Sequence, residues 1–253
     1  TQFAMVPLNL LPEGKTAAYI VNGSWGSKAY KEAKLVGDAA VAATTKDGGV
    51  RSVPAFSASA LPENAAYVHI TSNETIEGVQ FAEFPDTGKV PLVADMSSDI
   101  MSRPFDVSKF GLIYAGAQKN LGPSGVTVVI ARDELVDASP AHVPTMLRYD
   151  THAASNSLYN TPPTYAIYIM NLVLAWVEAQ GGLAEIERKN REKTDWIYRA
   201  IDESGGFYRG HAERPYRSRM NITFRVADEE TEKRFLAEAE AAGFVGLRGH
   251  RSV

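Results

Sequence analysis

An aspartate and a lysine, each following a short apolar run, are the residues of this sequence best placed for chemistry. Asp95 ends the run at 91–95, and Lys119 comes shortly after the run at 111–115. Ligands of open α/β sheets bind outside the carboxyl ends of the strands, so both side chains are expected at one site. An acid that pairs with a pyridinium nitrogen and a lysine that forms a Schiff base are the groups that an enzyme dependent on pyridoxal phosphate (PLP) requires.

The elements that must position these residues alternate between strand-like and helix-like patterns. A helix-like stretch runs from Ser24 to Lys34, with Ser24 as the candidate N-cap. The expected strands are at 17–21, 39–43, 67–70, 91–95, 111–115 and 126–131. Short strands that are apolar on both faces suit a mostly parallel sheet covered by helices, so we expect an α/β fold.

The second half of the chain is expected to begin with two long helices, each ending at a pair of glycines. The expected elements are helices at 164–180, 183–203 and 229–242 and strands at 220–225 and 244–247. We place a domain boundary near Arg188, inside the second helix. Residues 1–187 then form a large domain, and residues 188–253 form a small α+β domain.

The composition excludes several classes of protein. The chain has 253 residues, no cysteine and a formal net charge of −4. Without cysteine there is no disulfide, no thiolate metal site and no cysteine desulfurase chemistry. The net charge gives no sign of a nucleic-acid partner. No apolar run approaches the roughly 18 residues of a membrane-spanning helix, so we expect no membrane partner and a cytoplasmic location.

Seven short motifs, in order along nearly the whole chain, carry a resemblance to a known family. They are Ser72-Asn-Glu-Thr75-Ile-Glu-Gly, Ala94-Asp95-Met-Ser-Ser, Ser102-Arg-Pro, Tyr114-Ala-Gly-Ala-Gln-Lys119-Asn, Tyr159-Asn160-Thr161-Pro-Pro, Ser218-Arg-Met-Asn-Ile and Gly249-His250-Arg251. With these motifs the chain resembles the phosphoserine aminotransferases, which are PLP enzymes of the aspartate aminotransferase fold. The resemblance implies a large domain with a mostly parallel sheet and a truncated small α+β domain.

The resemblance also implies roles for residues around the cofactor ring. Lys119 is the Schiff-base residue and then shuttles a proton at the substrate α-carbon, while Asp95 pairs with the pyridine nitrogen. Thr75 matches the residue that hydrogen-bonds the phenolate oxygen, although alone it reads as a turn former. Trp25 matches an aromatic that stacks on the ring. The helix that starts at Ser24 is expected to contribute weakly to phosphate binding.

Polar residues further along the chain match groups that bind phosphate in this family. Gln118 and, from the neighbouring subunit, Asn160 and Thr161 correspond to residues that hold the cofactor phosphate. His250 and Arg251 correspond to residues that bind the phosphate of the substrate, because arginine pairs bidentately with phosphate oxygens. The resemblance therefore implies a homodimer with a site shared across its interface.

The activity implied by the resemblance is amino transfer from glutamate to 3-phosphohydroxypyruvate, giving phosphoserine and 2-oxoglutarate. This is a step of serine biosynthesis, and the related step of pyridoxine biosynthesis is a second candidate use. The substrates are small and anionic, whereas no metal site is expected.

Three alternatives remain open. Another PLP aminotransferase or lyase of this fold would keep Lys119 and Asp95 but lose the His250-Arg251 pair. A dinucleotide-binding dehydrogenase is disfavoured because no G-x-G-x-x-G motif follows a strand. The third alternative is a non-catalytic scaffold, since the resemblance leads us to expect a fragment that lacks both ends of the family fold: a Gly-rich phosphate-binding turn before Thr1, and an arginine for the substrate carboxylate after Val253.

Overall fold

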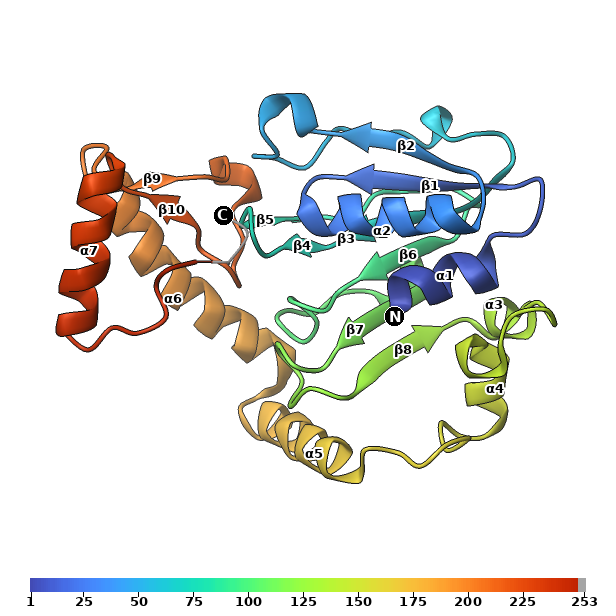
Figure 1. Ribbon diagram of the computed structural model, residues 1–253. Helices are drawn as coiled ribbons and strands as arrows, with labels where there is room; N and C mark the ends of the chain where they lie inside the picture. Colours follow the sequence, from blue (N-terminus) through green and yellow to red (C-terminus); the bar gives the residue numbers. More distant parts are fainter. Residues whose placement is uncertain (250–253) are drawn as a thin grey trace.

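A six-stranded sheet forms the centre of the computed structural model, which describes residues 1–249 (Figure 1). Its strands are β1 (Thr16–Val21), β2 (Ala39–Thr44), β3 (Ala65–Thr71), β6 (Leu92–Asp95), β7 (Leu112–Gly116) and β8 (Thr127–Ala131). They lie in the order β2-β1-β3-β6-β7-β8, with every neighbouring pair parallel except β7 and β8, which are antiparallel. The prediction of a mostly parallel α/β sheet is confirmed.

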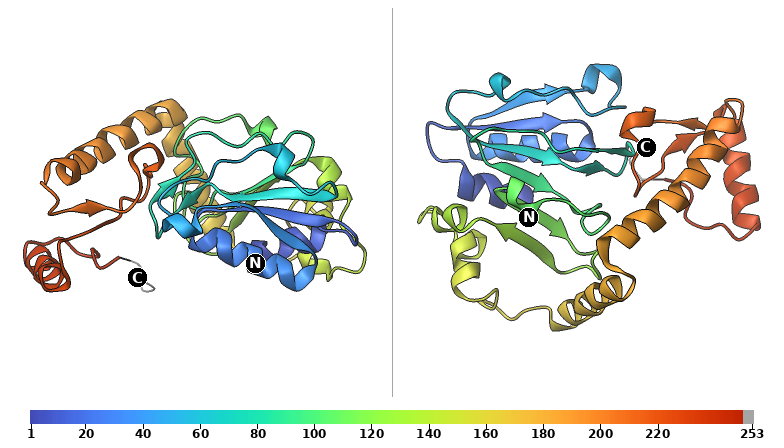
Figure 2. Two further views of the ribbon diagram at one scale, coloured as in Figure 1. Left: turned by 90° about the horizontal axis from the view of Figure 1, so that it is seen from above. Right: turned by 180° about the vertical axis from the view of Figure 1, so that it is seen from behind.

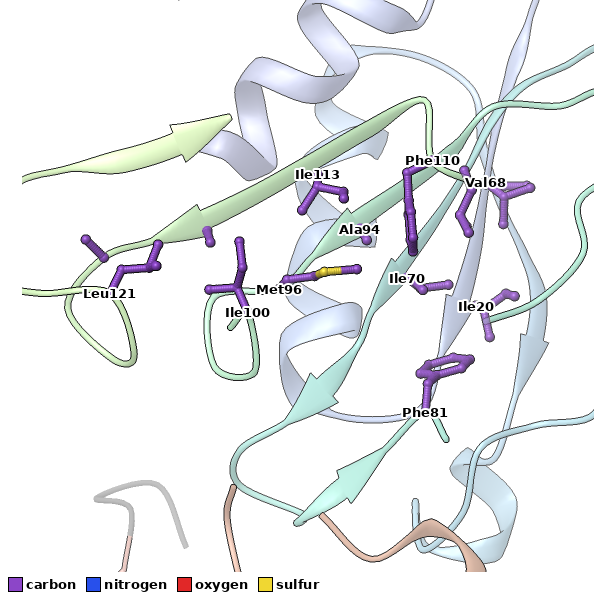
Figure 3. Packing of buried hydrophobic residues seen from close by; sticks show 14 residues of the cluster. Ile20, Val68, Ile70, Phe81, Ala94, Met96, Ile100, Phe110, Ile113 and Leu121 are labelled. Atoms are coloured by element: carbon purple, nitrogen blue, oxygen red, sulfur yellow. The ribbon is translucent and has the colours of Figure 1, made fainter. Parts of the chain in front are cut away.

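Two hydrophobic clusters cover the two faces of this sheet, because successive side chains of a strand point to opposite faces. The helices α1 (Gln2–Leu10) and α2 (Ser24–Val36) cover one face (Figure 2). Residues such as Tyr19, Tyr67 and Val93 are buried on this face. The other face carries the alternate residues of the same strands. Figure 3 shows this second cluster, with Ile20, Val68, Ile70, Ala94 and Ile113 packed against Phe81, Met96 and Phe110.

The remaining helices and strands lie outside the six-stranded sheet. They are the hairpin β4 (Asn73–Glu74) and β5 (Val79–Gln80), the helices α3 (Asp133–Asp137), α4 (Tyr149–Ala154), α5 (Thr164–Ala179), α6 (Gly182–Glu203) and α7 (Glu229–Ala241), and the strands β9 (Arg209–Gly210) and β10 (Phe224–Arg225). Short 3-10 helices lie at Lys46–Gly48, Ala58–Ala60, Val107–Lys109, Thr145–Leu147 and Arg214–Tyr216. The parallel strands point their carboxyl ends toward the side where the β4–β5 hairpin and the β9–β10 pair lie (Figure 1).

Of two predicted strands in the C-terminal part, one is only partly correct and the other is wrong. Of the stretch 220–225 only β10 is a strand, because Ser218 Oγ accepts hydrogen bonds from the backbone N–H groups of Met220 and Asn221 and holds a turn there. The stretch 244–247 is not a strand either. The N–H of Phe244 bonds back to the carbonyl of Ala239, and the positive φ angles at Gly243 and Gly246 interrupt an extended backbone.

Both long helices agree with the prediction within a residue. The helix α6 passes Arg188 without interruption, so the domain boundary proposed there stays a prediction. Within residues 1–249, no helix by itself has the length and apolar character needed to cross a bilayer; α5 and α6 reach that threshold only when taken together, and they are bent by 83° at the break between them.

Candidate active site

A cavity of about 300 Å³ lies at the carboxyl ends of β6 and β7 and beside the start of α1. Asp95, Lys119, Trp25 and Gln118 all line it, although they come from three separate segments of the chain. The other lining residues are Thr1, Gln2, Phe3, Thr71, Asn73, Ser97, Ser98, Tyr114, Gly116 and Thr127. The acid and the lysine that the sequence singles out therefore face one common space.

Asp95 is the last residue of β6 and is buried, with 8% of its surface exposed. Ser97 donates two hydrogen bonds to its Oδ1, from the backbone N at 2.9 Å and from Oγ at 2.6 Å. No hydrogen bond from residues 1–249 reaches Oδ2, which leaves that oxygen available to a ligand. Burial raises the pKa of Asp95, whereas the Ser97 hydrogen bonds and the charge of Lys119 act in the opposite direction.

Lys119 follows β7 and places its Nζ 5.4 Å from the centroid of the Trp25 ring. Desolvation lowers the pKa of Lys119, and the nearby charges of Asp95, Glu74 and Asp99 oppose that shift. A lysine acts as a nucleophile or a base only after it loses a proton, so a lowered pKa favours either role.

Trp25 and Thr75 form a hydrogen-bonded pair at the side of the cavity. The indole Nε1 of Trp25 donates to Thr75 Oγ1 at 2.8 Å, and the indole lines the cavity. Because Thr75 accepts this bond, its own hydroxyl proton remains able to reach a further acceptor. Thr75 does not itself line the cavity. It lies next to the site because it bonds to Trp25, which does line the cavity.

Two helices begin next to the cavity, and they begin differently. Among residues 1–249, no side chain caps the start of α1, and Thr1, Gln2 and Phe3 line the cavity. The start of α2, by contrast, is bound to carboxylates. The backbone N and Oγ of Ser24 donate to Glu77 Oε1 at 2.8 and 2.6 Å, and the N–H groups of the next two residues donate to Glu74.

This arrangement overturns two expectations about Ser24. The N-cap of α2 is Gly23, so Ser24 is the first helical residue rather than the cap. The expected contribution of this helix start to phosphate binding is also wrong. The carboxyl groups of Glu77 and Glu74 already accept its first N–H groups, so these donors are not available to a phosphate.

The remaining predicted site residues fall into three groups. Gln118 lines the cavity, and its side-chain amide packs so closely on Gly116 that a Cβ there would lie 2.7 Å from Oε1. Asn160 and Thr161 are exposed on the segment between α4 and α5 and do not line this cavity. His250 and Arg251 lie outside the described residues. The assignment of Asn160 and Thr161 to a neighbouring subunit's site stays a prediction.

Several residues of the site were not predicted from the sequence. Ser97 holds Asp95, and its Oγ also accepts the N–H of Gly116 at 3.0 Å, so it ties β6 to β7. Tyr114 stands opposite Asp95 in the parallel register and exchanges a 2.9 Å hydrogen bond with His69 Nε2. The register of neighbouring strands would have indicated Tyr114, because residues opposite one another share a face.

A larger groove of about 580 Å³ lies between α6 and the β5 edge, and it lacks this combination of groups. Its arginines Arg217 and Arg219 pair with Asp202 and Asp195. These two arginines are therefore paired with acids, and the lysine and the strand-end acid lie in the other cavity.

A desolvated lysine and a buried strand-end acid that face one cavity in a mostly parallel α/β sheet define a PLP-dependent transferase. Comparisons with known proteins agree: the model of the aminotransferase class-V family matches residues 1–253. The chain is 62% identical to a phosphoserine aminotransferase of Niallia circulans over 253 residues, which is all of this chain and 70% of that protein. It is also 62% identical, over 252 residues and 70% of the relative, to a phosphoserine aminotransferase of Lysinibacillus sphaericus.

Solved structures give the same result. The phosphoserine aminotransferase from Bacillus circulans subsp. alkalophilus superposes with a TM-score of 0.96 at 61% identity, covering 99% of this chain and 70% of that one. Another phosphoserine aminotransferase, studied for radiation damage of its Schiff base, superposes with a TM-score of 0.97 at 55% identity, covering 100% and 70%. The chain belongs to the class V aminotransferases and, within them, to the phosphoserine aminotransferases.

Proposed function

We propose that this chain transfers the amino group of glutamate to 3-phosphohydroxypyruvate with the help of PLP, giving phosphoserine and 2-oxoglutarate. The observation that carries the proposal is the meeting of Asp95 and Lys119 in one cavity, beside the indole of Trp25. The relatives at 62% identity are phosphoserine aminotransferases, which supports this choice of substrates. Use of the same chemistry in pyridoxine biosynthesis is a second part of the proposal.

The residues of the cavity fit PLP in their chemistry. Asp95 has a carboxylate oxygen available for a protonated ring nitrogen, and Lys119 offers an amine with a lowered pKa. Gln118 and the uncapped start of α1 provide N–H donors, and a helix start favours a negatively charged phosphate. When bound, PLP draws electrons away from the substrate α-carbon, so that a C–H bond there breaks more readily.

The protein's own groups then hold the ring and move protons. Asp95 stays ionised when it pairs with a cationic ring nitrogen, and Ser97 holds its carboxylate in place. Trp25 provides a flat apolar surface, and Thr75 provides a hydroxyl beside it. The amine of Lys119, once deprotonated, would take the proton from the substrate α-carbon and deliver it to the cofactor.

A second copy of the chain completes the site in this proposal. Asn160 and Thr161 reach the cofactor phosphate of the neighbouring subunit, and His250 and Arg251 bind the anionic substrates. The homodimer is supported by α5, which follows Asn160 and Thr161 and leaves large apolar side chains exposed. Tyr165, Tyr168 and Trp176 are 74%, 57% and 55% exposed. Residues 188–253 act as the small domain in this proposal, and the protein works in the cytoplasm.

A comparison of amino donors tests the proposal against other PLP enzymes of the same fold. The PLP-loaded protein is assayed in the reverse direction, with 2-oxoglutarate as acceptor and either phosphoserine or serine as donor. We expect kcat/KM to be at least about a hundredfold higher for phosphoserine, because charge-assisted contacts to the phosphate are absent for serine. Equal values would refute the phosphorylated substrate, and no transfer from either donor would support the scaffold alternative.

A further inference from the structure

Glu74, a buried carboxylate next to the cavity, has no role in the family assignment above. It lies on β4 and is fully buried, with 0% of its surface exposed. Its Oε2 accepts the backbone N–H of Trp25 at 2.9 Å, and its Oε1 accepts the N–H of Gly26 at 2.7 Å. One carboxylate thus holds two successive N–H groups in the first turn of α2.

The fit between Glu74 and the start of α2 leaves no room for another side chain. A Cβ at Gly23 would lie 2.4 Å from both Cγ and Cδ of Glu74, and a Cβ at Gly26 would lie 3.2 Å from Oε1. The backbone of Gly23 is extended, so steric closeness rather than an unusual φ angle explains the glycine. Gly23 and Gly26 therefore allow the carboxylate to reach the helix start.

Burying this carboxylate has a large electrostatic cost. Burial raises the pKa of Glu74 to about 8, even though two backbone N–H groups favour the charged form. The neighbouring carboxyls of Glu77 and Asp95 raise the pKa further. An apolar residue at this position would avoid that cost but could not accept the N–H groups of Trp25 and Gly26.

Trp25 is held at two points by two consecutive residues. Glu74 accepts the backbone N–H of Trp25, and Thr75 accepts its indole N–H at 2.8 Å. The hairpin formed by β4 and β5 carries both acceptors on one short segment. Movement of this segment would therefore move the backbone and the ring of Trp25 together.

We propose that Glu74 is a positioning residue that fixes the plane of the Trp25 indole before the cofactor enters the cavity. The inference rests on the proposed function, because it takes the indole to be the surface on which the PLP ring stacks. Glu74 acts through Trp25 and touches neither cofactor nor substrate. Glu74 binds the start of α2 and thereby orders the aromatic surface of Trp25 before the cofactor binds.

Tryptophan fluorescence tests this proposal without any cofactor. The chain has three tryptophans, and Trp176 and Trp196 are 55% and 64% exposed. Replacing both, Trp176→Phe and Trp196→Phe, leaves Trp25 as the single reporter. In this background Glu74→Gln is compared with the matched control Glu77→Gln. Glu77 accepts the N–H of Ser24 but makes no hydrogen bond to Trp25.

The expected result separates the two glutamates. In Glu74→Gln one of the two N–H groups faces an amide NH₂ instead of an oxygen, so the Trp25 emission shifts to the red and acrylamide quenching rises about twofold. Glu77→Gln leaves both quantities unchanged. PLP titration of the same proteins gives about fivefold weaker binding for Glu74→Gln only, the loss expected when stacking on an aromatic ring is impaired.

Unchanged emission, quenching and PLP affinity in a folded Glu74→Gln protein would overturn the proposal. If far-UV circular dichroism shows that this variant is unfolded, Gly23→Ala replaces it, because the added Cβ displaces the carboxylate while leaving its charge. Hydrogen exchange on the unaltered chain is independent of both variants: the N–H groups of Trp25 and Gly26 should be protected, and exchange at the rate of an unstructured peptide would overturn the proposal. A protein that binds no PLP would refute the proposed function, but the cofactor-free fluorescence would still test Glu74.

Discussion

The starts of α1 and α2 lie beside the same cavity, yet one is open and the other is closed by acids. Thr1, Gln2 and Phe3 at the start of α1 line the cavity, and within residues 1–249 no side chain caps it. The first N–H groups of α2 instead bond to Glu74 and Glu77. A helix start attracts negative charge, so we expect an anion that enters the cavity to bind at the start of α1 rather than at α2, whose first N–H groups already have acceptors.

The two helix starts show how neighbouring side chains control where an anion can bind in a small site. Both helices offer the same backbone groups, and only the side chains around them decide whether an exogenous phosphate binds. Asp95 lines the cavity and Glu74 is buried beside it, while the start of α1 and Gln118 supply donors. Lys119 lies near the acids, whose charges partly counteract its desolvation.

The largest effect is expected for Lys119, the lysine that lines the cavity near Asp95. Lys119→Ala should lower turnover at least about a thousandfold, because it removes both the covalent anchor and the general base. The matched control is Lys28→Ala. Lys28 Nζ also lies over the Trp25 ring, at 4.2 Å, but Lys28 does not line the cavity, so its turnover should change less than about twofold. Similar losses in both variants would refute the role of Lys119.

The raised pKa of Glu74, at the start of α2, leads us to expect that the free energy of unfolding depends on pH. The pKa of Glu74 is raised to about 8 in the folded chain from an ordinary value of 4.5. Between these values the folded state keeps a proton that the unfolded chain has lost, so the free energy of unfolding falls as the pH rises. The expected slope is about 1.4 kcal/mol per pH unit, and above pH 8 the contribution stays constant.

Urea denaturation of Glu74→Gln and the unaltered chain, at a series of pH values, measures this effect. The stability of the variant relative to the unaltered chain should rise from about pH 4.5 to 8 and then level off. In Glu77→Gln the loss of stability with rising pH should remain but end at a lower pH, because the Glu77 carboxyl helps to raise the pKa of Glu74. Parallel profiles for Glu74→Gln and the unaltered chain would show that Glu74 titrates normally.

Adding an acid to the open helix should make α1 resemble α2. Gln2→Glu keeps an acceptor for the hydroxyl of Tyr149, which donates to Gln2 Oε1 at 2.7 Å. The new carboxylate should weaken PLP binding by about tenfold or more through repulsion of the phosphate. Glu77→Gln should change the affinity less than about threefold, as measured by titration with PLP. Unaltered affinity in Gln2→Glu would contradict the assignment of the phosphate to α1.

The smallest effect is expected for Ser24, the residue at the boundary of the closed helix. Ser24→Ala removes the hydroxyl bond to Glu77 but keeps the backbone one, so stability should fall by about 1 kcal/mol. The affinity for PLP should not change, because this helix start does not face the phosphate. Thermal denaturation and PLP titration measure the two quantities. A large loss of affinity would indicate that the start of α2 does bind the phosphate.

The sheet was predictable because buried parallel strands leave short apolar runs in the sequence. Each of the six runs became a strand, with bounds shifted by at most two residues. The same pattern indicated Asp95 and Lys119, since the carboxyl ends of neighbouring strands meet at one edge. The C-terminal part was less predictable: the stretch at 220–225 is apolar enough for a strand, but Ser218 holds its first residues in a turn.

The closed start of α2 shows why local sequence was not enough within the site. A serine after a glycine is typical of an N-cap, so the pattern favoured Ser24. The groups that actually bind this helix start lie 48 to 53 residues further along the chain, on and after β4. Only the pairing of β3 with its neighbours brings them to α2, and no short-range pattern records that contact.

Reduction of the PLP-loaded protein with borohydride, followed by digestion and mass spectrometry, identifies the lysine that binds PLP. Borohydride makes the link between PLP and its lysine permanent, so the modified peptide identifies the residue. We predict a single modification, at Lys119, which vanishes in Lys119→Ala. Modification at Lys28, the lysine nearer to the Trp25 ring, or no modification under saturating PLP, would contradict the account.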